Sequence, residues 1–202
     1  MIQRINLDGS EHPSFIGCWM LENVSLCDGL MEFFEHNKEA QSPGVTANRK
    51  VQEINKKSMD IGITPLDLKK EQFHIVSTYI EHLKVCYLDY LEQWEFLKSA
   101  FPKLHIGSFN LRRYDEGDHF QALHAERTSL NSLHRVLAWM TYLNDVPEDG
   151  ETEFPMFGLK IKPQKGKTLI WPAEWTHAHI GTVVKRGNKY ITTGWMHYPD
   201  NI

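Results

Sequence analysis

Two short segments of this 202-residue sequence carry the side-chain types that hold a divalent metal. In His124-Ala125-Glu126, an imidazole and a carboxylate lie two residues apart, and an extended strand would project both from one face. The segment Trp175-Thr176-His177-Ala178-His179 offers a second imidazole from either histidine. Two histidines and a carboxylate on one face of an octahedron leave three positions open, the ligand set that non-haem Fe(II) uses in oxygen chemistry. An isolated His-x-Glu also occurs by chance, so the pattern needs support from the rest of the chain.

A lysine follows the second segment at the start of a predicted strand. Alternation along Lys189-Tyr190-Ile191-Thr192-Thr193-Gly194-Trp195 places the lysine on the same face as Ile191, Thr193 and Trp195. A cation on an inward, mostly apolar face is costly unless an anion pairs with it, so a bound carboxylate is the expected partner of Lys189. The alternative is a solvated strand end that binds no ligand.

The elements that must position these residues divide the chain in two. Apolar residues at helical spacing predict a helix from Leu26 to His36, capped by Ser25, and a longer helix over residues 65–95, capped by Thr64. Beyond about residue 105 the pattern changes to short strands separated by turns. The expected strands are Ile106–Tyr114, Arg135–Leu143, Leu159–Ile161, Thr168–Trp171 and Tyr190–Trp195. This order predicts an antiparallel barrel or sandwich supported by helices along one side.

Composition excludes several classes of function. Lys and Arg total 22 against 26 Asp and Glu, a net charge of −4 without blocks of like charge, which argues against binding to nucleic acid or a membrane surface. No apolar run approaches the roughly 20 residues of a membrane span, and no signal-peptide core follows the first residues. The three widely spaced cysteines fit reduced thiols. We therefore expect a cytoplasmic protein, in an oligomeric state that the sequence leaves open.

A series of short motifs runs in order through residues 105–198. They are Tyr114-Asp115-Glu116-Gly117, Phe120, His124-Ala125-Glu126, Arg135, Tyr142-Leu143-Asn144-Asp145, Gly150-Glu151-Thr152-Glu153-Phe154-Pro155, Pro163-x-x-Gly166, His179, Gly187-Asn188-Lys189-Tyr190 and Trp195. Together they resemble the catalytic domain of iron- and 2-oxoglutarate-dependent dioxygenases of the prolyl 4-hydroxylase type. The resemblance implies an α+β fold in one domain, residues 1–202. Mainly helical residues 1–104 would support a catalytic double-stranded β-helix, or jelly roll, over residues 105–202.

The resemblance also implies roles for individual residues. His124, Glu126 and His179 match the iron ligands, and Lys189 matches the cation that binds the distal carboxylate of 2-oxoglutarate. The family spaces its second histidine ten residues before this cation, which selects His179 over His177. Most prolyl-hydroxylase-like members carry Asp where this chain has Glu126. The longer side chain keeps an oxygen ligand, so the departure bears on prolyl specificity more than on metal binding.

Further residues and cofactors follow from the same resemblance. Tyr142 matches a tyrosine that in some members hydrogen-bonds the same carboxylate. Arg135, Tyr114 and Trp195 are candidates for substrate contacts. The implied cofactors are Fe(II), 2-oxoglutarate as co-substrate and O2, with ascorbate as an auxiliary reductant.

The sequence leaves several functions in competition. The closest resemblance predicts hydroxylation of an unactivated C–H bond in a prolyl-hydroxylase-like reaction on a peptide or protein. The Glu126 departure favours a free amino acid or small metabolite instead. A cupin-like metal hydrolase or isomerase would use the same ligands without needing Lys189, and a silent binding module would be expected to have lost a ligand or the lysine.

Overall fold

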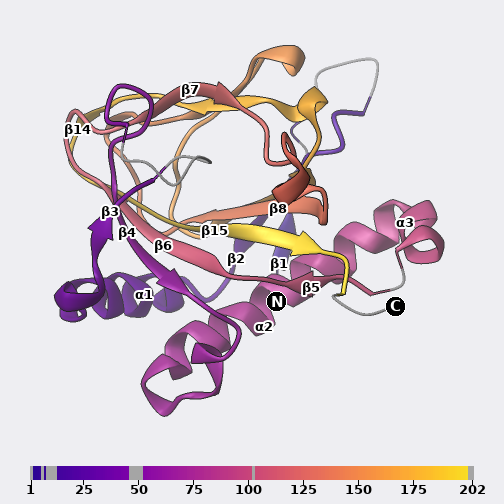
Figure 1. Cartoon of the computed structure of the whole chain (residues 1–202), viewed down its shortest axis with the longest axis horizontal. Helices are drawn as coiled ribbons and strands as arrows, with labels where there is room; N and C mark the ends of the chain where they lie inside the picture. The colour runs from indigo at the N-terminus through magenta and orange to yellow at the C-terminus, as the bar shows by residue number, and fades with distance from the viewer. Residues whose placement is uncertain (1, 6, 8–12, 46–51, 102, 200–202) are drawn as a thin grey trace.

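Two antiparallel sheets face each other, and two helices cover the outer face of the larger one (Figure 1). This computed structural model describes residues 2–5, 7, 13–45, 52–101 and 103–199. The larger sheet has the order β1-β2-β12-β8-β15-β6-β4-β3, with β5 paired to β15, and the smaller has the order β11-β10-β13-β7. Their strands are β1 Ile2–Arg4, β2 Gly17–Leu21, β3 Ser42–Pro43, β4 Met59–Ile63, β5 His105–Ile106, β6 Phe109–Tyr114, β7 Phe120–His124, β8 Arg135–Tyr142, β10 Thr152–Phe154, β11 Leu159–Ile161, β12 Lys167–Pro172, β13 His179–Gly181 and β15 Lys189–His197. A separate ribbon pairs β9 Glu148–Asp149 with β14 Val184–Arg186.

Both predicted helices are present, but each begins at a different residue from the one predicted. The helices are α1 Ser25–His36, α2 His74–Gln93 and α3 Glu95–Ala100. Ser25 is the first residue of α1 rather than its cap. Among the described residues no helix is long and apolar enough to cross a membrane.

The second predicted helix begins later than expected. Thr64 and Asp67 bond each other, since the Thr64 backbone N–H and hydroxyl both donate to the Asp67 carboxylate at 2.9 and 2.7 Å. These bonds close a separate 3-10 turn, η2 Asp67–Lys69, after which Lys70 is extended with ψ 140°. The predicted start at residue 65 was therefore wrong, because the capping signal belongs to this turn and not to α2, which begins at His74.

The five segments predicted as strands in the second half are strands, whereas β7, β9, β10, β13 and β14 were not among the predicted segments. Ile106–Tyr114 divides into β5 and β6. The expected Arg135–Leu143 extends one residue beyond β8, and the other three expected segments lie within β11, β12 and β15. The first half is less purely helical than expected, because β1 to β4 extend the larger sheet. Residues 1–104 therefore contribute part of one wall of the barrel as well as the supporting helices.

Alternation along β15 separates the two halves of the hydrophobic core. Tyr190 and Met196 pack with the helices α1 and α2, whereas Ile191 and Trp195 pack between the two sheets. Lys189 lies on the side of Ile191 and Trp195, as the strand period predicts. The same residues that build the strand therefore direct a lysine into the barrel.

Packing of α2 on the sheet predicts a specific stability loss. Leu83 of α2 is fully buried in the core, whereas Leu88 of the same helix is 51% exposed. Leu83→Ala should lower the free energy of unfolding by about 2 to 5 kcal/mol, because it removes buried methyl groups and leaves a cavity. Urea denaturation followed by circular dichroism measures this loss. Leu88→Ala is the matched control, and an equal effect of both changes would contradict the proposed packing.

Candidate metal centre

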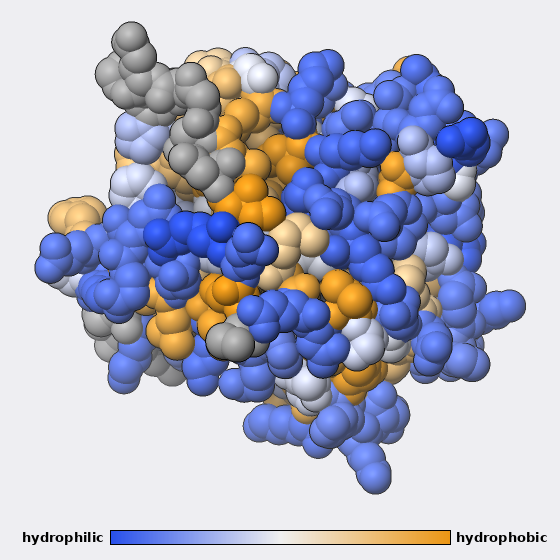
Figure 2. Space-filling model, turned by 180° about the vertical axis from the view of Figure 1, so that it is seen from behind, coloured by the Kyte–Doolittle hydropathy of each residue, from blue (hydrophilic) through white to orange (hydrophobic). Residues whose placement is uncertain are grey.

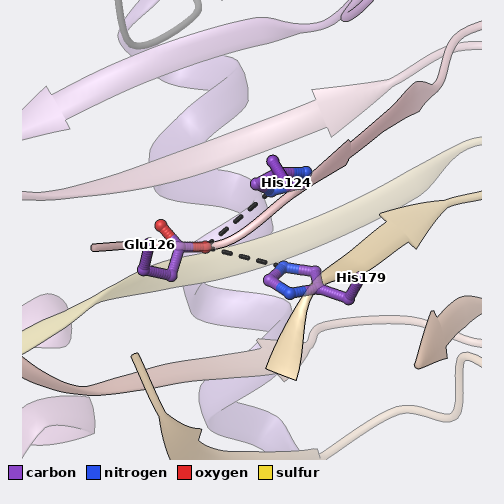
Figure 3. A group of neighbouring side chains, drawn as sticks. All are labelled: His124, Glu126 and His179. Carbon is purple, nitrogen blue, oxygen red and sulfur yellow. Dashed lines mark ion pairs between the residues drawn. The ribbon is translucent and has the colours of Figure 1, made fainter. Parts of the chain in front are cut away.

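The three predicted ligands meet where β7 and β13 pair (Figure 3). His124 ends β7 and His179 begins β13, and the antiparallel register sets these two residues directly opposite each other. Their imidazole rings lie 4.4 Å apart between centroids. Glu126 follows β7 by two residues and returns its carboxylate toward both rings. The strand pairing therefore brings together side chains that lie more than fifty positions apart in sequence.

The distances suit a single small ion. Glu126 Oε1 lies 3.8 Å from His124 Nε2 and 3.5 Å from His179 Nε2, and the three potential ligand atoms lie within 4.8 Å of one another. Ligand atoms in adjacent octahedral positions at about 2.1 Å from an ion lie about 3 Å apart. Small side-chain shifts would thus close the set around one divalent cation. Two imidazole nitrogens and one carboxylate oxygen are donors that suit Fe(II).

Hydrogen bonds fix the histidines in the tautomer that a metal needs. His124 Nδ1 lies 2.8 Å from the Ala122 carbonyl oxygen, and His179 Nδ1 lies 3.0 Å from that of His177. A carbonyl only accepts, so both Nδ1 atoms carry the proton and both Nε2 lone pairs face Glu126. Burial, together with the neighbouring His179, lowers the pKa of His124 to about 4, which keeps this imidazole neutral.

Glu126 is held in its charged form and in one orientation. Burial opposes ionisation, but the hydrogen bond from Trp195 and the nearby positive charge of Arg135 favour the carboxylate, and the pKa of Glu126 is lowered. Trp195 Nε1 donates to Glu126 Oε2 at 2.6 Å, which leaves Oε1 directed at the histidines. Arg135 donates to the Glu126 backbone carbonyl at 2.9 Å, and its guanidinium lies 3.6 Å from the Trp195 ring centroid. Arg135 and Trp195, which were predicted to contact substrate, therefore orient the candidate metal ligand Glu126 in this structure.

Lys189 lies inside the barrel and is only 2% exposed, so it is not a solvated strand end. Its ammonium donates to the Gly150 carbonyl at 2.9 Å and lies 4.5 Å from the Tyr114 ring centroid. No carboxylate of the described residues lies within ion-pair distance of it. Burial and the nearby Arg112 lower the pKa of Lys189 to about 7, with a weaker opposing effect of Glu151. A bound anion would restore the charged form, so this position suits the distal carboxylate of 2-oxoglutarate.

The two predicted tyrosines lie in the same interior. Tyr114 packs its ring against the Lys189 ammonium and is buried, which places it beside the lysine rather than on an outer substrate surface. The Tyr142 hydroxyl lies 2.6 Å from Thr152 Oγ1 and 3.2 Å from the Ile161 carbonyl. A hydroxyl has one proton, so Tyr142 would have to give up its present donation to donate to a bound carboxylate.

His177 lies away from the metal centre. It belongs to the 3-10 turn η6 Trp175–His177 and not to β13, so it does not share a strand face with His179. Its Nε2 lies 2.8 Å from the Ser14 carbonyl, and its ring packs 5.0 Å from that of Phe157. Its backbone carbonyl, by contrast, orients His179.

A buried ionic network beside the site was not predicted. Arg112 of β6 binds both carboxylate oxygens of Asp60 of β4 at 2.8 and 2.9 Å, and Lys56 binds the same carboxylate at 2.9 Å. The local signal was an arginine at an inward position of a predicted strand. The positions of Lys56 and Asp60 depend on the pairing of β4 with β6, which no sequence pattern indicated.

A further hollow lies apart from the ligands. Apolar side chains gather between polar ones on the face opposite to that of Figure 1 (Figure 2). A groove of about 450 Å³ is lined by residues that include Phe15, Trp94, Phe96, Phe101 and Tyr198. None of the three ligands lines this groove, so it is not the metal site.

The fold is a double-stranded β-helix, and two histidines and one carboxylate inside it form a candidate metal centre. Residues 109–197, which include all three ligands and Lys189, match the family model of the 2OG-Fe(II) oxygenase superfamily. This stretch is therefore similar to 2OG-Fe(II) oxygenases, and the relatives described next are prolyl hydroxylases.

Curated relatives resemble part of the chain. The probable prolyl 4-hydroxylase 9 of Arabidopsis thaliana is 29% identical over 139 residues, 56% of this chain and 48% of the relative. The prolyl 4-hydroxylase subunit alpha-1 of Homo sapiens is 29% identical over 96 residues, 44% of this chain and 17% of the relative. The chain therefore spans about half the length of the plant relative and less of the human one.

Solved structures resemble nearly the whole chain in fold. The viral collagen prolyl hydroxylase of Paramecium Bursaria Chlorella virus-1, in complex with 2OG, has a TM-score of 0.62 at 19% identity and covers 98% of this chain and 96% of its own. A Pseudomonas putida prolyl-4-hydroxylase has a TM-score of 0.69 at 17% identity and covers 92% and 94%. These likenesses confirm the double-stranded β-helix.

The hydrogen bond to Glu126 predicts a change in metal affinity. Trp195→Phe keeps the aromatic packing but removes the Nε1 donor, so Glu126 loses the bond that directs Oε1 at the histidines. The affinity for Mn(II), measured by isothermal titration without oxygen, should fall about 10- to 100-fold, as for other partners of metal ligands. Trp175→Phe, at a side chain 68% exposed, should leave the affinity unchanged. Equal affinities of the Trp195 variant and the parent protein would show that this bond does not position the ligand.

Proposed function

We propose that the protein is an Fe(II)- and 2-oxoglutarate-dependent oxygenase that hydroxylates an unactivated C–H bond of a prolyl residue in a peptide or protein. The observation that carries the proposal is the combination of the His124, Glu126 and His179 cluster with Lys189, a buried cation without a carboxylate partner among the described residues. The prolyl hydroxylases among its relatives supply the substrate class. One relative in fold, from Trichoplax adhaerens, was solved with a hypoxia inducible factor peptide fragment.

Different residues of the chain would bind the metal and the co-substrate. His124, Glu126 and His179 would hold Fe(II), and Lys189 would bind the distal carboxylate of 2-oxoglutarate. When bound, these groups supply the oxidising power that inserts an oxygen atom from O2 into a C–H bond. O2 as the oxidant and ascorbate as an auxiliary reductant are part of the proposal.

Aromatic rings around the ligands support the exclusion of water. Phe120 stacks on His124 at 3.8 Å between centroids with an angle of 15°. Phe154 and Trp171 each lie 5.2 Å from His179. Such a shell lowers the local dielectric and restricts solvent access, which protects a reactive centre from side reactions. Trp195 and the two backbone carbonyls at Nδ1 keep the ligands oriented.

Lys189 separates this proposal from the non-oxidative alternative. A metal hydrolase or isomerase needs the three ligands but has no use for a buried cation deeper in the barrel. A silent binding module would not be expected to keep all three ligands in the metal-binding tautomer beside that cation. The intact set therefore favours the oxygenase.

Replacing Lys189 should affect co-substrate binding without affecting the metal. In Lys189→Met the distal carboxylate of 2-oxoglutarate would lose its buried ionic partner, so its Kd for the Mn(II)-loaded protein should rise about 100-fold. Isothermal titration without oxygen gives both the 2-oxoglutarate and the Mn(II) affinities. Lys185→Met, at a side chain 60% exposed, is the matched control. Unchanged 2-oxoglutarate affinity in Lys189→Met would favour a hydrolase or isomerase.

Turnover tests the proposed reaction directly. With Fe(II), 2-oxoglutarate and air, prolyl peptides should stimulate succinate release and gain one oxygen atom by mass spectrometry. His179→Ala should abolish both signals, since it removes an iron ligand. Succinate release that no prolyl peptide stimulates would exclude the prolyl substrate class, and absence of 2-oxoglutarate binding would exclude the oxygenase.

A further inference from the structure

The network of Lys56, Asp60 and Arg112 contains more positive than negative charge. Asp60 and Arg112 face each other across β4 and β6, and all three side chains are buried. Arg112 uses two nitrogens on the Asp60 carboxylate in a bidentate pair. Asp60 also accepts from Ser58 Oγ at 2.8 Å. This carboxylate is therefore fully engaged, and its single negative charge neutralises only one of the two cations.

Lys56 is the cation that the network leaves without a counterion of its own. Its side chain is only 2% exposed. The ammonium has three N–H donors and, among the described residues, two acceptors, Asp60 Oδ2 at 2.9 Å and the Val45 carbonyl at 3.2 Å. Burial and the positive charge of Arg112 lower the pKa of Lys56 to about 8, against the attraction of Asp60. Burying such a charge is costly unless an anion compensates it.

This ammonium lies one aromatic ring away from the metal centre. Lys56 Nζ is 5.7 Å from the centroid of the Phe120 ring, and Phe120 stacks directly on His124. A ligand group held at Lys56 would therefore lie close to the reacting centre.

The surplus positive charge of Lys56 would persist when Fe(II) and 2-oxoglutarate are bound. The two charges of Fe(II) would be balanced by Glu126 and by one carboxylate of 2-oxoglutarate. Lys189 would be balanced by the other carboxylate, and Arg112 is balanced by Asp60. Lys56 remains.

We propose that Lys56, supported by Arg112, binds a carboxylate of the substrate beside the metal centre. This inference rests on the Fe(II)- and 2-oxoglutarate-dependent hydroxylation of the proposed function. It defines the substrate as a compound with a negative charge near the hydroxylated carbon, whether a peptide or a free amino acid. The carboxylate could belong to a free amino acid or to an acidic side chain next to the target residue in a peptide. Both sources present the same group to the ammonium.

Acetate serves as a probe that does not depend on knowing the substrate. In the protein loaded with Mn(II) and saturating 2-oxoglutarate, acetate at Lys56 would lie near a paramagnetic ion, so the ¹³C relaxation of labelled acetate should increase and saturate. Lys56→Met should weaken acetate binding about tenfold, since a charge-assisted bond is lost. Lys57→Met removes the neighbouring charge, on a side chain 49% exposed, and should behave as the parent protein.

A second variant acts in the opposite direction. Asp60→Asn removes the shared negative charge at nearly constant shape, so the affinity for acetate should increase. It also keeps the proposal testable if Lys56→Met fails to fold, which thermal unfolding would show. Relaxation that does not saturate in the parent protein, or acetate affinity that neither variant changes, would overturn the carboxylate site. Failure of the parent protein to bind Mn(II) or 2-oxoglutarate would instead refute the proposed function.

Matched pairs of substrates identify the source of the carboxylate. One pair is L-proline and L-prolinamide, and the other is a blocked Gly-Asp-Pro-Gly peptide and its Asn counterpart. Preference for L-proline would assign the carboxylate to a free amino acid, and preference for the Asp peptide would assign it to a side chain. In either case the preference should disappear in Lys56→Met and persist in Lys57→Met. Equal turnover of charged and neutral members would contradict the proposal.

Discussion

The antiparallel register of β7 and β13 is the constraint on which the rest of the site depends. It sets His124 opposite His179, so the two Nε2 atoms converge without any long-range side-chain rearrangement. A shift of the register by one residue would turn one imidazole to the other face of the sheet and destroy the cluster. The larger sheet and its helices hold this pairing in place by burying the opposite wall of the barrel.

Charge inside the barrel imposes the second constraint. Lys189, Lys56 and Arg112 are all buried, and among the described residues only Arg112 has a carboxylate largely to itself. Bound anions would neutralise these buried charges, and without them the charges lower the stability of the folded protein. We interpret this loss of stability as a consequence of function, since groups arranged to receive charged ligands leave the empty site electrostatically incomplete.

Trp195 fixes the orientation of the candidate ligand Glu126 by a hydrogen bond to its carboxylate. The extra methylene lets Glu126 reach the histidines with one oxygen while the other accepts from Trp195. Arg135 completes the arrangement by stacking on that indole and binding the Glu126 backbone. The departure from aspartate is thus accommodated by neighbours that orient the longer chain, which agrees with an intact metal site.

The sequence by itself determined what depends on local spacing. The His-x-Glu segment, the inward face of β15 that carries Lys189, and the helical period of α1 and α2 all follow from the two- and 3.6-residue repeats of the backbone. The resemblance selected His179, and the position of His177 in a turn facing Ser14 agrees with that choice. The start of α2 was mistaken because Thr64 and Asp67 satisfy each other locally before the helix begins.

Only the tertiary structure decided which distant side chains meet. Arg112 and Asp60 lie 52 positions apart, and Trp195 and Glu126 lie 69 apart, so their bonds depend on strand order and register in the larger sheet and on the meeting of the two sheets. The local sequence around an arginine in a strand does not show whether its side chain binds substrate, contacts solvent or pairs with a residue of another strand. Local periodicity fixes the face that a side chain occupies, whereas its partner is set by the pairing of segments that the sequence pattern does not encode.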